Sequence, residues 1–281
     1  MIRSLKALVL AICCAAVIVP FFGIIATSLA SREDVTRAGG FVMFPSGISF
    51  DAYEAILSGG VVTRATVVSL LVTVVGTALS LVATTLLAYG LSRRGTLLHR
   101  PLLAMVLLPL LFTPGIIPSY LIVKYLGLLD TYWSLILPVM VNAFNVIVLR
   151  AFFMELPQEV MDSARIDGAG DFAVLWRIVL PMSKAVLAVV ALFYAVAYWN
   201  SFFGALLYIN DTAKWPLQLV LRTYVVNQSE LGVDQLGGTE LPPREAIQMA
   251  ILVLSIIPVL LVYPFVQRHF TKGVLVGAVK G

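Results

Sequence analysis

The sequence predicts an all-α membrane protein in which six helices cross the bilayer. The composition gives the first two observations: 60% of the 281 residues are hydrophobic and only 12% are charged, against about 25% charged residues in soluble domains. The third is that apolar runs of about 20 residues, long enough to span a hydrocarbon core of roughly 30 Å, recur along the chain. The six predicted spans are Leu5–Leu29, Val67–Leu91, Leu102–Leu121, Trp133–Phe153, Ala185–Ile209 and Ile247–Val266.

The first span predicts an anchor helix over residues 1–30. Arg3 and Lys6 lie at its start, and Ser28-Leu29-Ala30 at its end resembles a cleavage site, so a cleaved signal peptide is the alternative. The apolar core is longer than the 7–15 residues of a signal peptide, which favours a retained helix.

Residues 31–63 are predicted to form an extracytoplasmic loop that contains a short interfacial helix. The apolar positions Phe50, Tyr53, Ile56 and Leu57 recur there at helical spacing, as expected for a helix on a membrane surface. The remaining residues, 64–281, are predicted to form a five-helix core.

Basic residues predict the orientation of the helices. They gather after the second and sixth spans and around the connection between the fourth and fifth, and include Arg93, Arg94, Arg100, Arg150, Arg165, Arg177, Lys184, Arg268, Lys272 and Lys280. By the positive-inside rule both termini and these connections are cytoplasmic, and the loops 31–62 and 210–245 are outside. Because the basic residues flank apolar runs instead of forming a patch, the net charge of +4 does not indicate nucleic-acid binding.

The third predicted span holds several helix breakers, namely Pro109, Pro114, Gly115 and Pro118. A kinked or partly unwound helix is therefore expected, which membranes tolerate where the backbone lines a cavity or packs on protein. The alternative is a simple proline kink without a role in transport.

Polar and aromatic residues inside the fourth and fifth spans form a candidate substrate path. Amides within a span usually face other helices or a water-filled cavity. Aromatic rings can stack on the apolar faces of sugars while amides and phenols bind hydroxyls. Whether the residues bond neighbouring helices or a sugar is left open by the pattern. The candidates are Asn142, Asn145, Tyr198, Trp199 and Asn200.

The stretch 155–181 is polar at its start and lies between two apolar spans. It predicts a cytoplasmic hairpin of two short helices, broken around Gly168 and Gly170. Asp171 is expected to cap the second helix. The alternative is an ordinary cytoplasmic loop with a surface helix.

The sequence contains no motif for nucleotide binding, intramembrane proton transfer, catalysis or metal binding. It lacks a G-x-x-x-x-G-K-[ST] nucleotide loop, an intramembrane carboxylate relay, catalytic pairs and metal-ligand spacing. We therefore expect a transport subunit rather than an enzyme, with no cofactor of its own and no metal.

Three motifs resemble binding-protein-dependent ABC importer permeases of the carbohydrate type. Residues 162–169, read as D-S-A-R-I-D-G-A, resemble the E-A-A-x-x-D-G-A loop of that family, with Asp162 and Ser163 replacing its usual Glu and first Ala. Residues 199–202 resemble its W-N-x-F element, and residues 273–281 its G-x-x-x-G-A-x-K-G terminus. Further stretches resemble a branch associated with complex or uronic-acid-containing oligosaccharides.

The resemblance implies the type I ABC importer permease fold and a bacterial cytoplasmic (inner) membrane location. It also implies a second homologous permease, two ATPase subunits that hold ATP and Mg, an extracytoplasmic sugar-binding protein and surrounding lipid. The hairpin 155–181 would then couple the permease to the ATPases. The residues that carry over as ATPase-coupling are Glu159, Asp162, Ala164, Arg165, Asp167, Gly168 and Ala169.

Two other functions are kept as alternatives. An ion-coupled secondary transporter of a small solute would be favoured by inverted repeats and intramembrane charge, which are not evident in the sequence. A membrane-embedded enzyme would turn over without partners.

Overall fold

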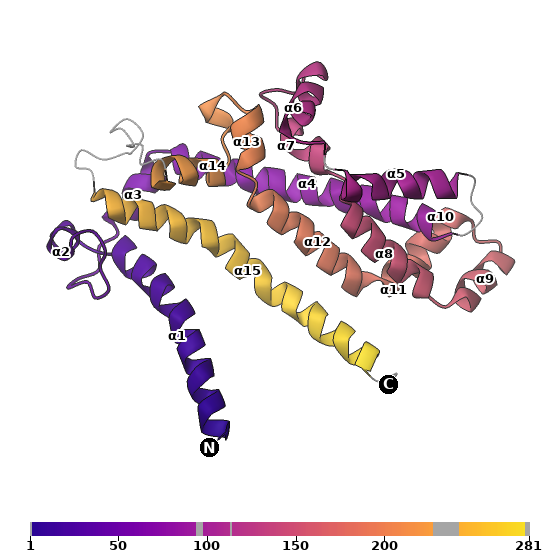
Figure 1. Ribbon diagram of the computed structural model, residues 1–281, viewed down its shortest axis with the longest axis horizontal. Coiled ribbons are helices and arrows are strands. Elements are labelled where there is room, and N and C mark those ends of the chain that lie inside the picture. The colour runs from indigo at the N-terminus through magenta and orange to yellow at the C-terminus, as the bar shows by residue number, and fades with distance from the viewer. Residues whose placement is uncertain (1, 94–97, 113, 227–241, 279–281) are drawn as a thin grey trace. The chain divides into compact units, whose positions relative to one another are not determined.

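A computed structural model describes residues 2–93, 98–112, 114–226 and 242–278, and within these ranges the regular elements are all helices (Figure 1). The predicted loop 210–245 and the terminal motif 273–281 therefore lie partly outside the described residues. The chain forms two compact units: Met1–Val68 with Trp215–Leu260, and Ser69–Lys214 with Leu261–Gly281.

The first unit contains the predicted N-terminal anchor. α1 runs over Ile2–Ser28, which confirms a helix over the first predicted span. Most of its side chains are exposed apolar groups, as expected of a helix surrounded by lipid. The other elements of this unit are α2 (Arg32–Ala38), α3 (Asp51–Ser58), the start of α4 (Val61–Ser92), α14 (Leu217–Leu221), η4 (Arg222–Val226) and the first part of α15 (Arg244–Ala278).

The connection after α1 is fastened to the end of that helix. The Thr27 hydroxyl donates to the Val42 carbonyl at 3.0 Å and accepts from the Val42 N–H at 2.9 Å, and the Ser28 and Tyr53 hydroxyls are 2.8 Å apart. α3 confirms the short helix predicted around Tyr53. It buries Ile56 and leaves Leu57 exposed, and its placement at a membrane surface stays a prediction.

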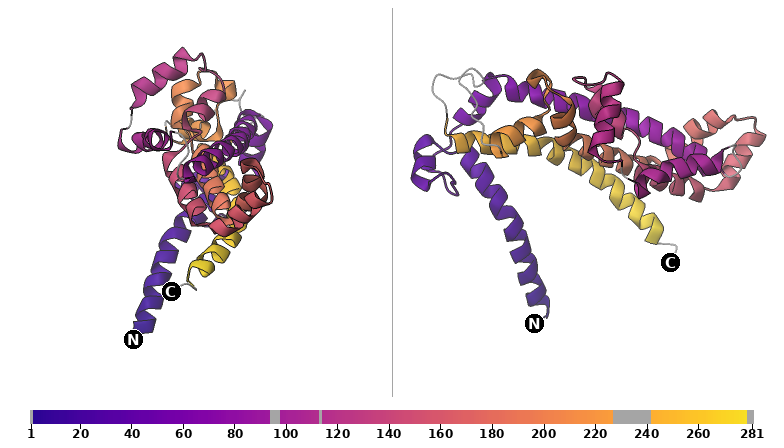
Figure 2. Two further views of the ribbon diagram at one scale, coloured as in Figure 1. Left: turned by 90° about the vertical axis from the view of Figure 1, so that its right-hand side faces the viewer. Right: turned by 45° about the horizontal axis from the view of Figure 1, so that its top comes forward.

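The second unit is built on most of α4, which contains the predicted span Val67–Leu91. α8 packs against α5 and α12, and α13 packs against α6 and α7 (Figure 2). The elements that follow α4 are α5 (His99–Leu111), α6 (Ile116–Tyr125), α7 (Trp133–Ile136), η1 (Leu137–Val139), α8 (Ala143–Glu155), α9 (Gln158–Ile166), α10 (Asp171–Val174), the π-helix η2 (Leu175–Val179), α11 (Leu180–Met182), α12 (Lys184–Trp199), α13 (Phe203–Tyr208) and η3 (Thr212–Lys214).

The third predicted span is interrupted, as its prolines and glycine indicated. α5 ends at Leu111 and α6 begins at Ile116. Gly115 separates them with φ +82°, a left-handed conformation that glycine adopts without strain. With 13 residues, α5 is about 20 Å long and too short to cross the hydrocarbon core alone.

The prediction that the fourth and fifth spans are continuous helices is wrong, because each is interrupted. The span Trp133–Phe153 breaks before α8, where the helices on either side meet at 51°, because the Asn142 side chain caps α8 by accepting from the Asn145 N–H at 3.2 Å. The span Ala185–Ile209 breaks after Trp199, where α12 ends. Both breaks fall at asparagines, which satisfy backbone groups at helix ends.

The number of membrane-crossing helices therefore differs from a simple count of apolar runs. Among the described residues three helices are long and apolar enough to span a bilayer, and two bent pairs raise the number to five. α5 and α6 together occupy the position of the remaining predicted span.

Candidate functional site

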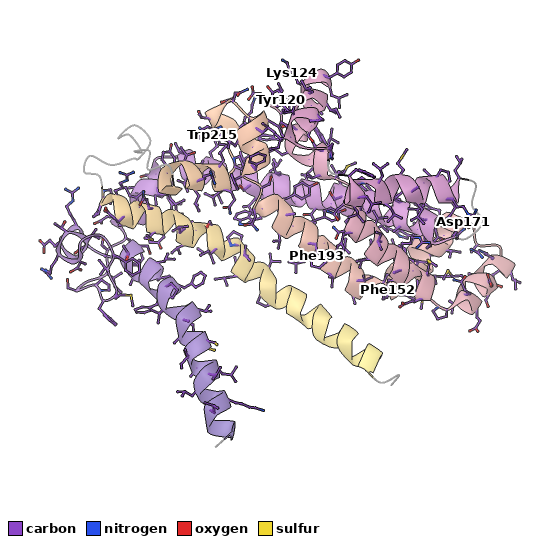
Figure 3. All side chains as sticks on the ribbon, in the orientation of Figure 1. Tyr120, Lys124, Phe152, Asp171, Phe193 and Trp215 are labelled. Atoms are coloured by element: carbon purple, nitrogen blue, oxygen red, sulfur yellow. The ribbon has the colours of Figure 1, made fainter. Side chains whose placement is uncertain are left out.

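A cavity of about 450 Å³ lies in the second unit between α8 and α12. Its lining combines aromatic rings, two asparagines and a serine, with no charged side chain among the described residues that line it. Figure 3 labels Phe193, which lies on α12 and contributes one of these rings. The full lining is Val139, Asn142, Phe144, Asn145, Phe193, Tyr194, Ala197, Tyr198 and Ser201.

The two buried tyrosines of the cavity wall are hydrogen-bonded to α4. The Tyr194 hydroxyl lies 2.6 Å from the Thr84 Oγ1 and accepts from the Asn142 backbone N–H at 3.0 Å. The Tyr198 hydroxyl donates to the Ile136 carbonyl at 3.3 Å and lies 2.8 Å from the Ser80 Oγ. Ser80 and Thr84 are fully buried one turn apart, so α4 fixes both rings.

The contact between α4 and Tyr198 is close because α4 has a glycine there. A Cβ at Gly76 would lie 2.8–2.9 Å from three atoms of the Tyr198 ring. Only a residue without a side chain permits this approach.

The structure brings together three of the five predicted substrate-path residues. Asn142, Asn145 and Tyr198 line the cavity, and of the three only Asn142 is exposed. Trp199 is buried outside this lining, and the exposed Asn200 donates from its amide to the Val196 carbonyl at 2.9 Å. Asn142 is therefore the predicted residue whose polar atoms are best placed to meet a solute.

The hairpin 155–181 folds as two helical arms joined by a tight turn. α9 ends where Gly168 takes φ +84°, and the N–H of Ala169 donates to the Ala164 carbonyl at 2.9 Å. This left-handed helix end is the conformation that favours glycine. The break predicted around Gly168 is thus observed.

The coupling residues predicted from the resemblance lie on or just after α9. Arg165 pairs with Asp162 at 3.0 Å within one turn. Among the seven, only Ala164 and Ala169 are half-buried, and Glu159, Asp162, Arg165, Asp167 and Gly168 are exposed.

Large apolar side chains of the hairpin are also exposed. Ile166 is 87% exposed, and Phe172 and Trp176 are 71% and 65% exposed. The two rings stack with centroids 6.4 Å apart. Exposed apolar groups of this size mark a surface that another protein or the membrane covers.

The expectation that Asp171 caps the second arm is wrong. Gly170 occupies the cap position without a side-chain cap, and the Asp171 carboxylate forms an ion pair with Arg93 instead. This pair lowers the pKa of Asp171. Arg93 lies just beyond α4, and the Tyr89 hydroxyl donates to the Asp171 carbonyl at 3.1 Å. Figure 3 labels Asp171 at this place.

A second polar link joins the α6–α7 connection to the segment after α13. Asp130, at φ +59°, accepts from the N–H groups of Asn210 and Asp211 at 2.6 and 2.9 Å. These bonds lower the pKa of the Asp130 carboxyl. The Lys214 ammonium donates to the Asp130 carbonyl at 2.9 Å.

The sequence interpretation gave no role to Ser80, Thr84 or Tyr89, and it used Arg93 only to predict the orientation of the helices. They form two pairs, each spaced four residues apart, in or just after the C-terminal half of α4. This spacing indicates a shared helix face but not its partners. Among the described residues no cluster of His, Cys, Asp or Glu could hold a metal ion.

Comparisons with known proteins agree with the resemblance found in the sequence. Residues 76–276 match the family described as "Binding-protein-dependent transport system inner membrane component". The chain is 47% identical over 266 residues, or 94% of its length, to the polygalacturonan/rhamnogalacturonan transport system permease protein YtcP of Bacillus subtilis (strain 168), of which it covers 93%. It is 48% identical over 94% of its length to protein LplC of the same organism, of which it covers 90%.

A solved structure shares the fold. It is a chain of a bacterial ABC transporter involved in the import of the acidic polysaccharide alginate. The TM-score is 0.90 at 31% sequence identity, and the match covers 96% of each chain.

Proposed function

This chain belongs to the family of binding-protein-dependent transport system inner membrane components, and we propose that it imports an acidic oligosaccharide as one permease subunit of an ABC importer. The observation that carries the proposal is likeness over nearly the whole chain to permeases for polygalacturonan/rhamnogalacturonan and alginate. These polymers share uronic acid units. Members of this family are transport subunits and not enzymes.

The cavity between α8 and α12 supports a sugar as the solute. Its rings offer flat apolar faces, and the exposed Asn142 amide offers both a donor and an acceptor for hydroxyls. Its lack of charged side chains among the described lining residues means that sugar carboxylates would find their cations elsewhere in the assembly. Trp199 and Asn200, which the sequence predicted as sugar contacts, would instead hold the end of α12 in place.

The substrate proposal is tested by changing Asn142 while keeping its cap. Asn142→Ser retains a side-chain oxygen for the N-terminus of α8 but removes the amide. In proteoliposomes that contain the whole importer, we expect uptake of a radiolabelled oligogalacturonide to fall about tenfold, as for one lost hydrogen bond of about 1.4 kcal/mol. Asn142→Asp keeps the cap and adds a negative charge, so uptake should fall further. Unchanged uptake in both variants would remove this cavity from the path.

The cavity test needs a sugar that the importer does carry. A neutral maltooligosaccharide of the same length is the matched control substrate. Uptake of the neutral sugar in preference to the oligogalacturonide would contradict the proposed acidic class.

The hairpin 155–181 is the proposed docking element for a partner ATPase. Residues 159–176 of the hairpin contain both the polar coupling residues and three exposed apolar side chains, Ile166, Phe172 and Trp176. A mixed polar and apolar surface of this kind is typical of protein interfaces. ATP and Mg would bind the ATPase subunits, and a second permease and an extracytoplasmic sugar-binding protein would complete the assembly.

Docking is tested at Gly168, where a Cβ added to the glycine would meet nothing within 4 Å. Gly168→Asn keeps the left-handed turn, which asparagine tolerates, and adds bulk. We expect loss of ATPase copurification. Gly39→Asn is the matched control because Gly39 also ends a helix at positive φ, +71°, with nothing within 4 Å. Equal copurification in both variants would overturn the docking proposal.

The orientation remains part of the proposal. The hairpin and both termini would be cytoplasmic, as the basic residues predict. A single cysteine at Ala169, in a chain whose Cys13 and Cys14 are replaced by alanine, should react with a membrane-impermeant maleimide only in inverted vesicles. Reaction in right-side-out vesicles would reverse the orientation.

A further inference from the structure

Three side chains form a compact contact between the end of α4 and the second arm of the hairpin. The Arg93 guanidinium pairs with the Asp171 carboxylate, donates to the Tyr89 hydroxyl and lies 4.6 Å from the centre of the Tyr89 ring. Tyr89 donates in turn to the Asp171 carbonyl. We name Tyr89, Arg93 and Asp171 the α4 latch.

The α4 latch resists movement of the hairpin relative to the end of α4. Two residues one helical turn apart hold the side chain and the backbone of a single residue, so that sliding and separation both break bonds. Tyr89 is buried, and its ring meets the Phe153 ring edge-on at 6.4 Å. Charge-assisted bonds are stronger than neutral ones. The Arg93 side chain is 23% exposed and that of Asp171 is 71% exposed, so water screens the ion pair from one side and the buried Tyr89 contacts supply the rest of the attachment.

The latch stays ionised under ordinary conditions. Arg93 holds the pKa of Asp171 below its usual range, so the carboxylate keeps its charge at neutral pH. Arg150 adds a further tie because its Nε donates to the Leu91 carbonyl at 2.9 Å, which joins α8 to the same end of α4.

α4 connects the latch to the cavity. The helix is continuous from Val61 to Ser92, and Ser80, which bonds Tyr198, precedes Tyr89 by nine residues, or about 14 Å along the axis. A displacement of the helix end therefore moves the residues that hold the cavity wall.

The covalent route from the hairpin to the cavity is less direct. It passes through the π-helical turn η2 and then through an 84° bend before α12. Both features interrupt the regular ladder of helical hydrogen bonds along this route. The latch is thus the straighter mechanical connection between the hairpin and the cavity.

We propose that Arg93 and Tyr89 are positioning residues that transmit movement of the hairpin, through α4, to the tyrosines of the cavity wall. The proposal rests on the proposed function, because the movement originates in a docked ATPase. It predicts that a broken latch uncouples hydrolysis from transport without releasing the ATPase.

The test uses the complete importer in proteoliposomes and measures ATPase copurification, ATP hydrolysis and sugar uptake. For Arg93→Gln and Tyr89→Phe, which both lie outside the hairpin, we expect copurification to be unchanged, hydrolysis to stay within about twofold, and uptake per ATP hydrolysed to fall about tenfold, equivalent to about 1.4 kcal/mol. The double variant should be no worse than either single one. Arg37→Gln is the control, since it removes an ion pair with Asp34 in the other unit.

Charge reversal supplies the second measurement. Arg93→Asp and Asp171→Arg should each uncouple the importer, and their combination should recover at least half of the lost ratio of uptake to hydrolysis. An unchanged ratio in the single variants would overturn the latch. Loss of the ATPase in those variants would also overturn it, by giving the three residues a structural role in docking. Failure of the Gly168→Asn test, in contrast, would contradict the docking proposal on which the latch depends.

Discussion

Replacing Gly76 with alanine should destabilise the second unit through one contact. The added Cβ would lie 2.8 Å from the Tyr198 ring, while ordinary contacts begin near 3.4 Å, so the ring must retreat by about 0.6 Å. Because Ser80 lies one turn further along the same helix, this retreat also lengthens its 2.8 Å bond to the Tyr198 hydroxyl. Overpacking of this kind typically costs about 1–3 kcal/mol.

The control for this prediction is Gly90→Ala on the same helix, where nothing lies within 4 Å of the new Cβ. Both variants gain the same helix propensity, so the difference between them isolates the clash. We expect the thermal unfolding midpoint of the purified importer in detergent to be several degrees lower for Gly76→Ala than for Gly90→Ala.

The contact between Gly76 and Tyr198 is also tested in a second background. In Tyr198→Leu, which removes the ring, Gly76→Ala should cost little more than Gly90→Ala. Equal midpoints for the two glycine variants in the natural background would refute the close approach of α4 and Tyr198. A penalty that persists without the ring would refute its assignment to that residue.

Three further predictions concern other parts of the second unit. Tyr194→Phe should lower stability by about 1–3 kcal/mol, measured by denaturant titration, because Thr84 and a backbone N–H lose a buried partner; no loss would mean that water replaces the hydroxyl. Asp130 has a lowered pKa, so its stabilisation is complete above the unfolded pKa of about 3.9 and is lost as pH falls through the folded value. The unfolding midpoint should therefore drop more steeply below about pH 4 in the natural chain than in Asp130→Asn, and parallel curves would contradict this. Gly115→Ala should cost about 1–2 kcal/mol because its φ is +82°, and a midpoint equal to that of the natural chain would indicate a relaxed break between α5 and α6.

Local chemistry predicted the long helices and two of the breaks, between α5 and α6 and around Gly168. The long apolar runs predicted α1 and α4, because backbone N–H and C=O groups in a membrane must form their hydrogen bonds within the helix itself. Pro114 and Gly115 gave the interruption between α5 and α6. Asn142 and Asn200 were interpreted as polar groups within spans, although both sit at helix ends. An asparagine within an apolar run has the same local pattern in either role.

The pairings that build the site could not be predicted from one sequence. Ser80 and Tyr198 are 118 residues apart, and Tyr89 and Asp171 are 82 apart. Short-range periodicity carries no information about partners at such separations. The motif around Gly168 identified the hairpin, but the pairing of Asp171 with Arg93 depends on how the helices pack.

We propose that ATP hydrolysis by a partner, and not an ion gradient, drives uptake through this chain. The most direct test is sugar uptake by proteoliposomes that contain the complete importer and its sugar-binding protein. Uptake should require ATP on the side of the ATPase subunits and should continue when ionophores collapse proton and sodium gradients. Uptake that proceeds without ATP and stops with the ionophores would contradict the claim and select the secondary transporter instead.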